Sequence, residues 1–165
     1  MSNTFAEAVT DAIGEDYVDV EGICDKLGVS LEYTQPNEYK PEFSGSIKKV
    51  GDSYRILINS DHPEGRQRFT IAHELAHYFL HQHIIDRLEL VDTALYRSGQ
   101  PNEVEREANI WAAAILMPHK LIKKHEKDAL NQGLKSNSQV LEYIANKMKV
   151  SKQVLAISMG IRDWE

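Results

Sequence analysis

The chain has 165 residues, of which 42% are hydrophobic and 27% are charged, a composition that excludes a collagen-like, coiled-coil or wholly disordered protein. Its net charge of −6 at pH 7 argues against a dedicated nucleic-acid-binding domain, which is usually basic. The longest apolar run has eight residues, too few to cross a bilayer, and the single cysteine, Cys24, excludes an internal disulfide. Without a secretory signal at its start, the chain is expected to be one domain in the cytoplasm.

The first 60 residues predict two short helices followed by a small sheet. In the helices, apolar residues recur at helical spacing, and a glycine, Gly14 or Gly28, follows the last of them. Gly51 and Asp52 separate two strand-like runs, which is a turn signal for an antiparallel β-hairpin. The predicted helices cover residues 4–13 and 20–27, and the predicted strands cover 29–34, 43–50 and 53–59.

The remainder predicts helices, apart from a loop with short helical pieces over residues 83–99. The strongest helix has neither proline nor glycine inside it, and Pro118 separates two others. The order of helices, a small antiparallel sheet and further helices is typical of an α+β fold. The predicted helices cover residues 66–81, 104–117, 118–130, 139–148 and 152–159.

Charge is distributed unevenly along the chain. Residues 1–65 carry 13 acidic and 5 basic side chains, whereas residues 119–155 carry 8 lysines and 3 acidic side chains. The simplest interpretation of the lysines is a solvated helical face, and the alternative is a surface for a polyanion or an acidic partner. Because Lys147, Lys149 and Lys152 lie in a helix–turn–helix-like tail, contact with DNA is a further hypothesis.

Residues 73–77 have the sequence HELAH, an HExxH motif inside the strongest predicted helix. His73 and His77 are one turn apart on the same helical face, so both imidazoles can bind one metal ion. Glu74 projects about 100° away from His73, close to the ion without competing as a ligand. The motif also arises by chance, but the apolar remainder of this helix favours a buried zinc site in which Glu74 is the general base.

A catalytic zinc ion needs a third protein ligand and an open position for water. Glu105 and Asn109 lie four residues apart on one face of the helix predicted over 104–117. Glu105 could bind the ion, and the side-chain oxygen of Asn109 could accept a hydrogen bond from the free ring nitrogen of a ligand histidine. Glu103 and Glu107 are better explained as acidic residues that stabilise a helix N-terminus.

His83 is the alternative third ligand, because the pattern HExxHxxLxxH has the spacing of the metzincin extension. That extension has glycine where this chain has Leu80, and leucine is poorly suited to the sharp turn required there. Glu105 is therefore favoured over His83. The other histidines lack metal-site spacing: His81 is predicted to be packed or exposed at the helix end, and His62, His119 and His125 are predicted to lie at the surface.

Two sequence blocks are RQRFTIAHELAH at residues 66–77 and EREANIWAAAILMP at residues 105–118. Both resemble the signatures of the ImmA/IrrE family of zinc metallopeptidases. The hairpin before them matches as well, so the resemblance covers about residues 19–121. It implies a single metallopeptidase-like domain with its catalytic core in that range and a helical C-terminal subdomain over residues 122–165.

The resemblance further implies that His73, His77 and Glu105 bind one Zn²⁺ ion and that Glu74 is the catalytic residue. Mn²⁺ or Fe²⁺ could occupy the same ligands. Family members are cytoplasmic proteins of bacteria, phages and mobile elements that are linked to cleavage of helix-turn-helix repressors, and others resemble toxin–antitoxin components. The implied partner is a protein substrate of the repressor class, and neither membrane binding nor direct nucleic-acid binding is expected.

Two questions stay open at this stage. The chain could instead be a zinc-stabilised binding module that regulates a repressor by contact, in which case Glu74 would be dispensable. A peptidase would also benefit from a side chain that stabilises the oxyanion. Tyr78, Tyr96 and His119 are candidates for that role, and the sequence does not distinguish among them.

Overall fold

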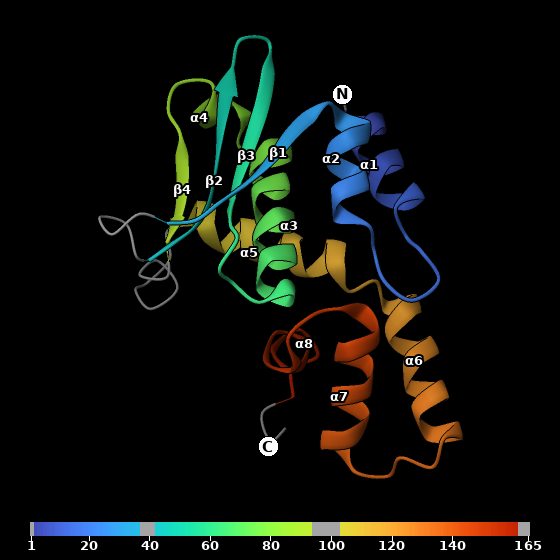
Figure 1. Ribbon diagram of the computed structural model, residues 1–165. Coiled ribbons are helices and arrows are strands. Elements are labelled where there is room, and N and C mark those ends of the chain that lie inside the picture. The colour runs from blue at the N-terminus through green and yellow to red at the C-terminus, as the bar shows by residue number, and fades with distance from the viewer. Residues whose placement is uncertain (1, 37–41, 94–102, 162–165) are drawn as a thin grey trace.

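The computed structural model describes residues 2–36, 42–93 and 103–161 (Figure 1). Eight helices and four strands lie within these ranges, which confirms the predicted α+β class. Among the helices described, none combines the length and the apolar character that crossing a membrane requires. The helices are α1 (Ser2–Asp11), α2 (Val20–Leu27), α3 (Glu64–Leu80), α4 (Gln82–Ile85), α5 (Glu103–Leu116), α6 (His119–Asn131), α7 (Asn137–Met148) and α8 (Lys152–Ser158), and the strands are β1 (Val29–Thr34), β2 (Phe43–Val50), β3 (Ser53–Asn59) and β4 (Leu90–Thr93).

The four strands form one mixed sheet in the order β1-β3-β2-β4 (Figure 1). β2 and β3 are the predicted antiparallel hairpin, whose turn places Gly51 at a φ of 63°, a conformation that glycine adopts without strain. β1 lies on the far side of β3 and pairs with it in parallel. One edge of the sheet is therefore parallel, whereas the sequence predicts antiparallel pairing only.

β4 is a strand that the sequence prediction misses, because residues 83–99 are expected to form a loop with short helical pieces. The structure has the short helix α4 at the start of this segment, and β4 then pairs antiparallel with the free edge of β2. Four residues carry too little alternation to identify a strand alone, and the pairing partner is distant in the chain. The rest of the predicted loop, from residue 94, lies outside the described residues.

α3 packs against the sheet and carries the HExxH motif (Figure 1). The close approach depends on Gly45 in β2, because a Cβ atom there would lie 2.5 Å from Cγ2 of Thr70 and 3.0 Å from the carbonyl oxygen of Leu57. Isoleucine side chains from β2 and β3 and the inner face of α3 form the buried core at this contact. The sheet therefore fixes the backbone of α3 about one turn before His73.

α5 packs along α3, which is its main neighbour in the described parts of the chain. The buried side chains of α5 include Ala108 and Ala112, and these small residues let the two helical backbones approach closely. Ile115 and Leu116 continue the buried face toward the end of the helix. This packing brings the polar first turn of α5 next to the HExxH motif of α3.

The C-terminal helices α6, α7 and α8 pack together. Lysines of this part of the chain form ion pairs with acidic residues of the N-terminal part. Between α1 and α2, the Asp16 carboxylate accepts a hydrogen bond from Lys124, 3.0 Å away, and lies 3.9 Å from the ammonium of Lys147. Lys149 forms an ion pair with Glu64 at 3.0 Å. The acidic and basic parts of the chain are thus partly complementary to each other.

The burial of His125 contradicts the predicted surface position. Its ring is fully buried, and Nε2 donates a hydrogen bond of 2.8 Å to the backbone carbonyl of Asp16. Leu121 and Ala129, four residues to either side, are also buried. His125 therefore lies on the inner face of α6, and its spacing to these apolar neighbours is the signal that could have predicted its burial.

Candidate metal centre

The structure brings together three of the residues predicted to bind metal. His73 and His77 lie one turn apart on the buried face of α3, with exposed fractions of 2% and 1% and with their Nε2 atoms 3.0 Å apart. Glu105, in the first turn of α5, places Oε2 3.1 Å from Nε2 of His73 and Oε1 3.4 Å from Nε2 of His77. One ligand atom from each residue lies within 4.8 Å of the other two.

These separations fit a single tetrahedrally coordinated ion. Zinc binds histidine nitrogen and carboxylate oxygen at roughly 2.0–2.1 Å, so two ligand atoms of a tetrahedron lie about 3.3 Å apart. The observed separations of 3.0 Å between the two nitrogens, and of 3.1 and 3.4 Å from each nitrogen to a different carboxylate oxygen of Glu105, lie close to that value. Two imidazole nitrogens and one carboxylate oxygen suit zinc, and they also suit manganese or iron.

The electrostatic environment favours the protonation states that a metal ion requires. Burial lowers the pKa of His77 below its usual value, although Glu105 opposes the shift. Burial alone would raise the pKa of Glu105, but the contacts of its carboxylate with the rings of His73 and His77 outweigh burial and hold the pKa of that carboxyl well below its usual range. A neutral imidazole beside an ionised carboxylate can bind a cation without first losing a proton.

The second ring nitrogen of each histidine also has a partner. Nδ1 of His73 lies 3.1 Å from Oδ1 of Asn109, the contact that the spacing of Glu105 and Asn109 predicts. Because Oδ1 only accepts, Nδ1 must carry the proton and Nε2 keeps its lone pair for a metal. Nδ1 of His77 lies 3.0 Å from Nδ1 of His81.

His81 and Glu107 belong to this cluster, although the sequence predicts other positions for both of them. His81 is only 4% exposed, and its Nε2 lies 3.3 Å from Oε2 of Glu107. His73, His77 and His81 follow one another at intervals of four residues, which places all three on one helical face. That spacing is the signal that could have identified His81, whereas Glu107 carries no comparable signal.

Glu74 lies on α3 directly after His73 and is 1% exposed. Carboxylates are seldom buried this completely, because removing a charge from water costs free energy unless the surroundings compensate it. The buried stretch of α3 extends to His77, so Glu74 lies in the same buried turn as the two histidines. It therefore has the position along the helix that the HExxH pattern requires of a general base.

His83, the alternative third ligand, is exposed on α4 and lies outside the group formed by His73, His77 and Glu105. The structure therefore favours Glu105 as the third member. α3 ends at Leu80, His81 separates it from α4, and the exposed His83 is the second residue of α4.

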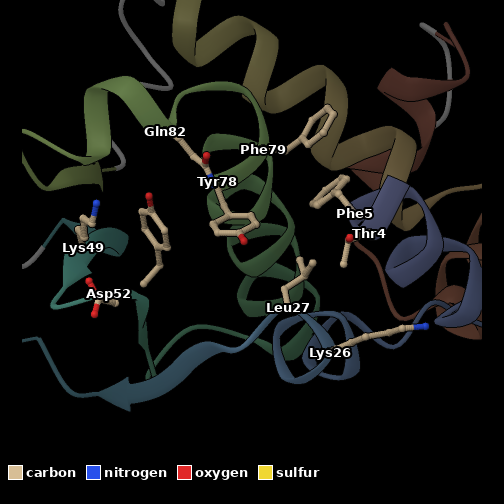
Figure 2. Close-up of a pocket in the computed structure, with 10 residues that line it drawn as sticks. Thr4, Phe5, Lys26, Leu27, Lys49, Asp52, Tyr78, Phe79 and Gln82 are labelled. Atoms are coloured by element: carbon tan, nitrogen blue, oxygen red, sulfur yellow. The ribbon is translucent and has the colours of Figure 1, made fainter. Parts of the chain in front are cut away.

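None of the contacts that the structure describes brings Tyr78 or His119, two candidates for oxyanion stabilisation, to the metal centre. The ring of Tyr78 packs edge-on against Tyr54 at 5.1 Å and lines a pocket of about 480 Å³ between α1, the hairpin and the end of α3 (Figure 2). The residues that line this pocket include none of the metal-binding group. His119 is exposed at the start of α6, and Tyr96 lies outside the described residues.

Comparison with known proteins extends the resemblance found in the sequence. A peptidase family model described as the IrrE N-terminal-like domain matches residues 24–159, which is more than half of the chain. The match extends beyond residue 121 and includes α6, α7 and α8. The metallopeptidase ImmA of Bacillus subtilis (strain 168) is 32% identical over 74 residues, which are 45% of this chain and 40% of ImmA. The chain thus matches less than half the length of that curated relative.

Proposed function

The chain belongs to the IrrE N-terminal-like peptidase family, and we propose that it is a metal-dependent endopeptidase with an ion bound by His73, His77 and Glu105. The observation that carries this proposal is the convergence of two buried imidazoles and one carboxylate within 4.8 Å. The buried Glu74 beside them favours catalysis over a purely structural ion, which would have no need of a further carboxylate. Zinc is the proposed metal because this ligand set is typical of catalytic zinc.

A metal ion at this site would polarise a peptide carbonyl and lower the pKa of a bound water. The side chains supply the remaining chemistry. Glu74 accepts a proton from the attacking water and returns it to the departing amine, which makes it the general base and then the general acid. Asn109 orients the ring of His73 through Nδ1, so that Nε2 faces Glu105.

The proposed substrate is a helix-turn-helix transcriptional repressor in a phage, mobile-element or stress-response system, in the cytoplasm. The proposed substrate rests on the family resemblance, and the relative named metallopeptidase ImmA supports the peptidase activity. The second candidate function is a zinc-stabilised module that controls a repressor by contact without cleavage. Both candidates need the metal ligands, but only the peptidase needs Glu74.

The test compares three variants in metal content and in proteolysis. Metal content is measured by mass spectrometry of the purified proteins, and new protein N-termini are mapped in host cells that produce each variant. We expect about one zinc per chain in the wild type, in Glu74→Gln and in the control His83→Ala, and none in Glu105→Ala. New N-termini should appear only with the wild type and His83→Ala. If Glu74→Gln still controls the repressor, the binding module is favoured. If the wild type takes up no metal, the proposal is contradicted.

A further inference from the structure

The ring of His77 makes two kinds of contact that differ in their chemistry. On one side, Nε2 faces the carboxylate of Glu105 and the ring of His73. On the other side, Nδ1 lies 3.0 Å from Nδ1 of His81, whose Nε2 lies 3.3 Å from Oε2 of Glu107. A continuous chain of polar contacts thus runs from Glu107 on α5 through His81 to His77 on α3.

The donor and the acceptor of each hydrogen bond between Glu107, His81 and His77 follow from where the ring protons lie. An ionised carboxylate only accepts hydrogen bonds, so Nε2 of His81 must carry the proton that faces Glu107. A neutral His81 then has a lone pair on Nδ1, and two ring nitrogens 3.0 Å apart share one proton. That proton belongs to Nδ1 of His77, and Nε2 of His77 keeps the lone pair that faces Glu105.

We propose that His81 and Glu107 are positioning residues of the metal centre, which hold the ring of His77 in the orientation and tautomer that binds the ion. The inference rests on the proposed function. Asn109 serves the same purpose for His73 through a single contact. Glu105, Glu107 and Asn109 all lie on α5, so one helix supplies a metal ligand and orients both ligand histidines of α3.

Burial and helix geometry support a fixed ring at position 81. The side chain of His81 is 5% exposed, whereas that of Glu107 is 50% exposed, so the chain of contacts leads from the buried centre to the surface. The backbone N–H of His81 donates to the carbonyl of His77 at 2.8 Å, which ties the end of α3 to the turn that carries the ligand. The rings of His77 and His81 lie 5.0 Å apart between centroids.

The test measures zinc affinity of the full chain by competition with a chromophoric chelator. His81→Ala and Glu107→Ala should each weaken zinc binding about 10- to 100-fold, which is the usual loss when a residue that orients a metal ligand is removed. His81→Asn places an amide oxygen where Nδ1 of the histidine lies, and Glu107→Gln keeps a carbonyl oxygen. Each variant can therefore still accept the same hydrogen bond, and both should recover most of the affinity. The matched control is Glu103→Ala, which removes the same charge one turn earlier on α5. Glu103 pairs with Arg106, so this variant should bind zinc like the wild type.

Two further readouts separate positioning from folding. The visible spectrum of the cobalt-substituted protein reports ligand geometry and should change in His81→Ala and Glu107→Ala but not in Glu103→Ala. Thermal unfolding of the metal-free proteins shows whether each variant folds. If His81→Ala does not fold, Glu107→Ala tests the inference instead, because the side chain of Glu107 is half-exposed. Equal zinc affinity in wild type and Glu107→Ala, or equal losses in Glu107→Ala and Glu103→Ala, would overturn the inference alone. A wild type without metal binding would overturn the proposed function as well.

Discussion

Replacing Gly45 with alanine tests whether the close packing of α3 on β2 holds the helix that carries the HExxH motif. The added Cβ would lie 2.5 Å from Cγ2 of Thr70, although carbon atoms in contact prefer about 3.5–4.0 Å. The carbonyl oxygen of Leu57, at 3.0 Å, leaves the strand little room to shift away. The helix or the strand must therefore move by about 1 Å, and overpacking of this kind costs about 1–3 kcal/mol in the free energy of unfolding.

A double-mutant cycle with Thr70→Ser attributes this cost to a single atom. Serine lacks Cγ2 and keeps the hydroxyl, so Gly45→Ala should cost about 1 kcal/mol less in the Thr70→Ser background than in the wild type. Urea unfolding followed by circular dichroism gives the four free energies, and Thr70→Ser alone is the control. If Gly45→Ala costs the same in both backgrounds, the explanation from close packing is wrong.

Three further predictions concern charge, burial and metal. The hydrogen bond from Lys124 lowers the pKa of Asp16, so its contribution to stability is present above about pH 4 and is lost as the pH falls through the lowered folded-state value. Acid unfolding followed by circular dichroism should therefore be less steep in Asp16→Asn, and an unchanged acid limb would contradict this. Arg68→Met removes hydrogen bonds to two backbone carbonyls and should cost about 2–4 kcal/mol in urea unfolding, whereas a loss below about 0.5 kcal/mol would show that water replaces them. Zinc at about 1,000 times its Kd should raise the free energy of unfolding by about 4 kcal/mol in the wild type and in Glu74→Gln but not in Glu105→Ala, and a chelator should reverse the effect.

Local signals explain why the bounds of the first three strands could be predicted from the sequence. Gly28 ends α2 in the left-handed conformation at a φ of 68°, and Gly51 makes the hairpin turn, so β1, β2 and β3 begin and end where the sequence predicts. β4 forms only because a distant strand offers a free edge, and the burial of His125 depends on the segment around Asp16. Neither of these contacts has a local signal strong enough to predict the partner.

The candidate site shows the same division between local and long-range information. His73 and His77 belong to one helix, so their spacing alone places both imidazoles on one face. Glu105 comes from a second helix, and its spacing to Asn109 together with the family resemblance identifies it. The contact between His81 and Glu107 depends on how α5 is rotated against α3, and the packing of the buried alanines of α5 sets that rotation.

The contacts of Asp16 limit how far the chain can be shortened at its N-terminus. The family match begins at residue 24, so a domain cut at that boundary would lack α1 and Asp16. Such a cut would remove the carbonyl of Asp16 that accepts a hydrogen bond from His125. It would also remove the ring of Phe5, which stacks on Phe79 of α3 with 4.5 Å between ring centroids. The buried ring of His125 on α6 would then lose the acceptor of its Nε2 proton. The smallest fragment that folds is therefore expected to retain the first 23 residues, although they lie outside the region by which the family is recognised.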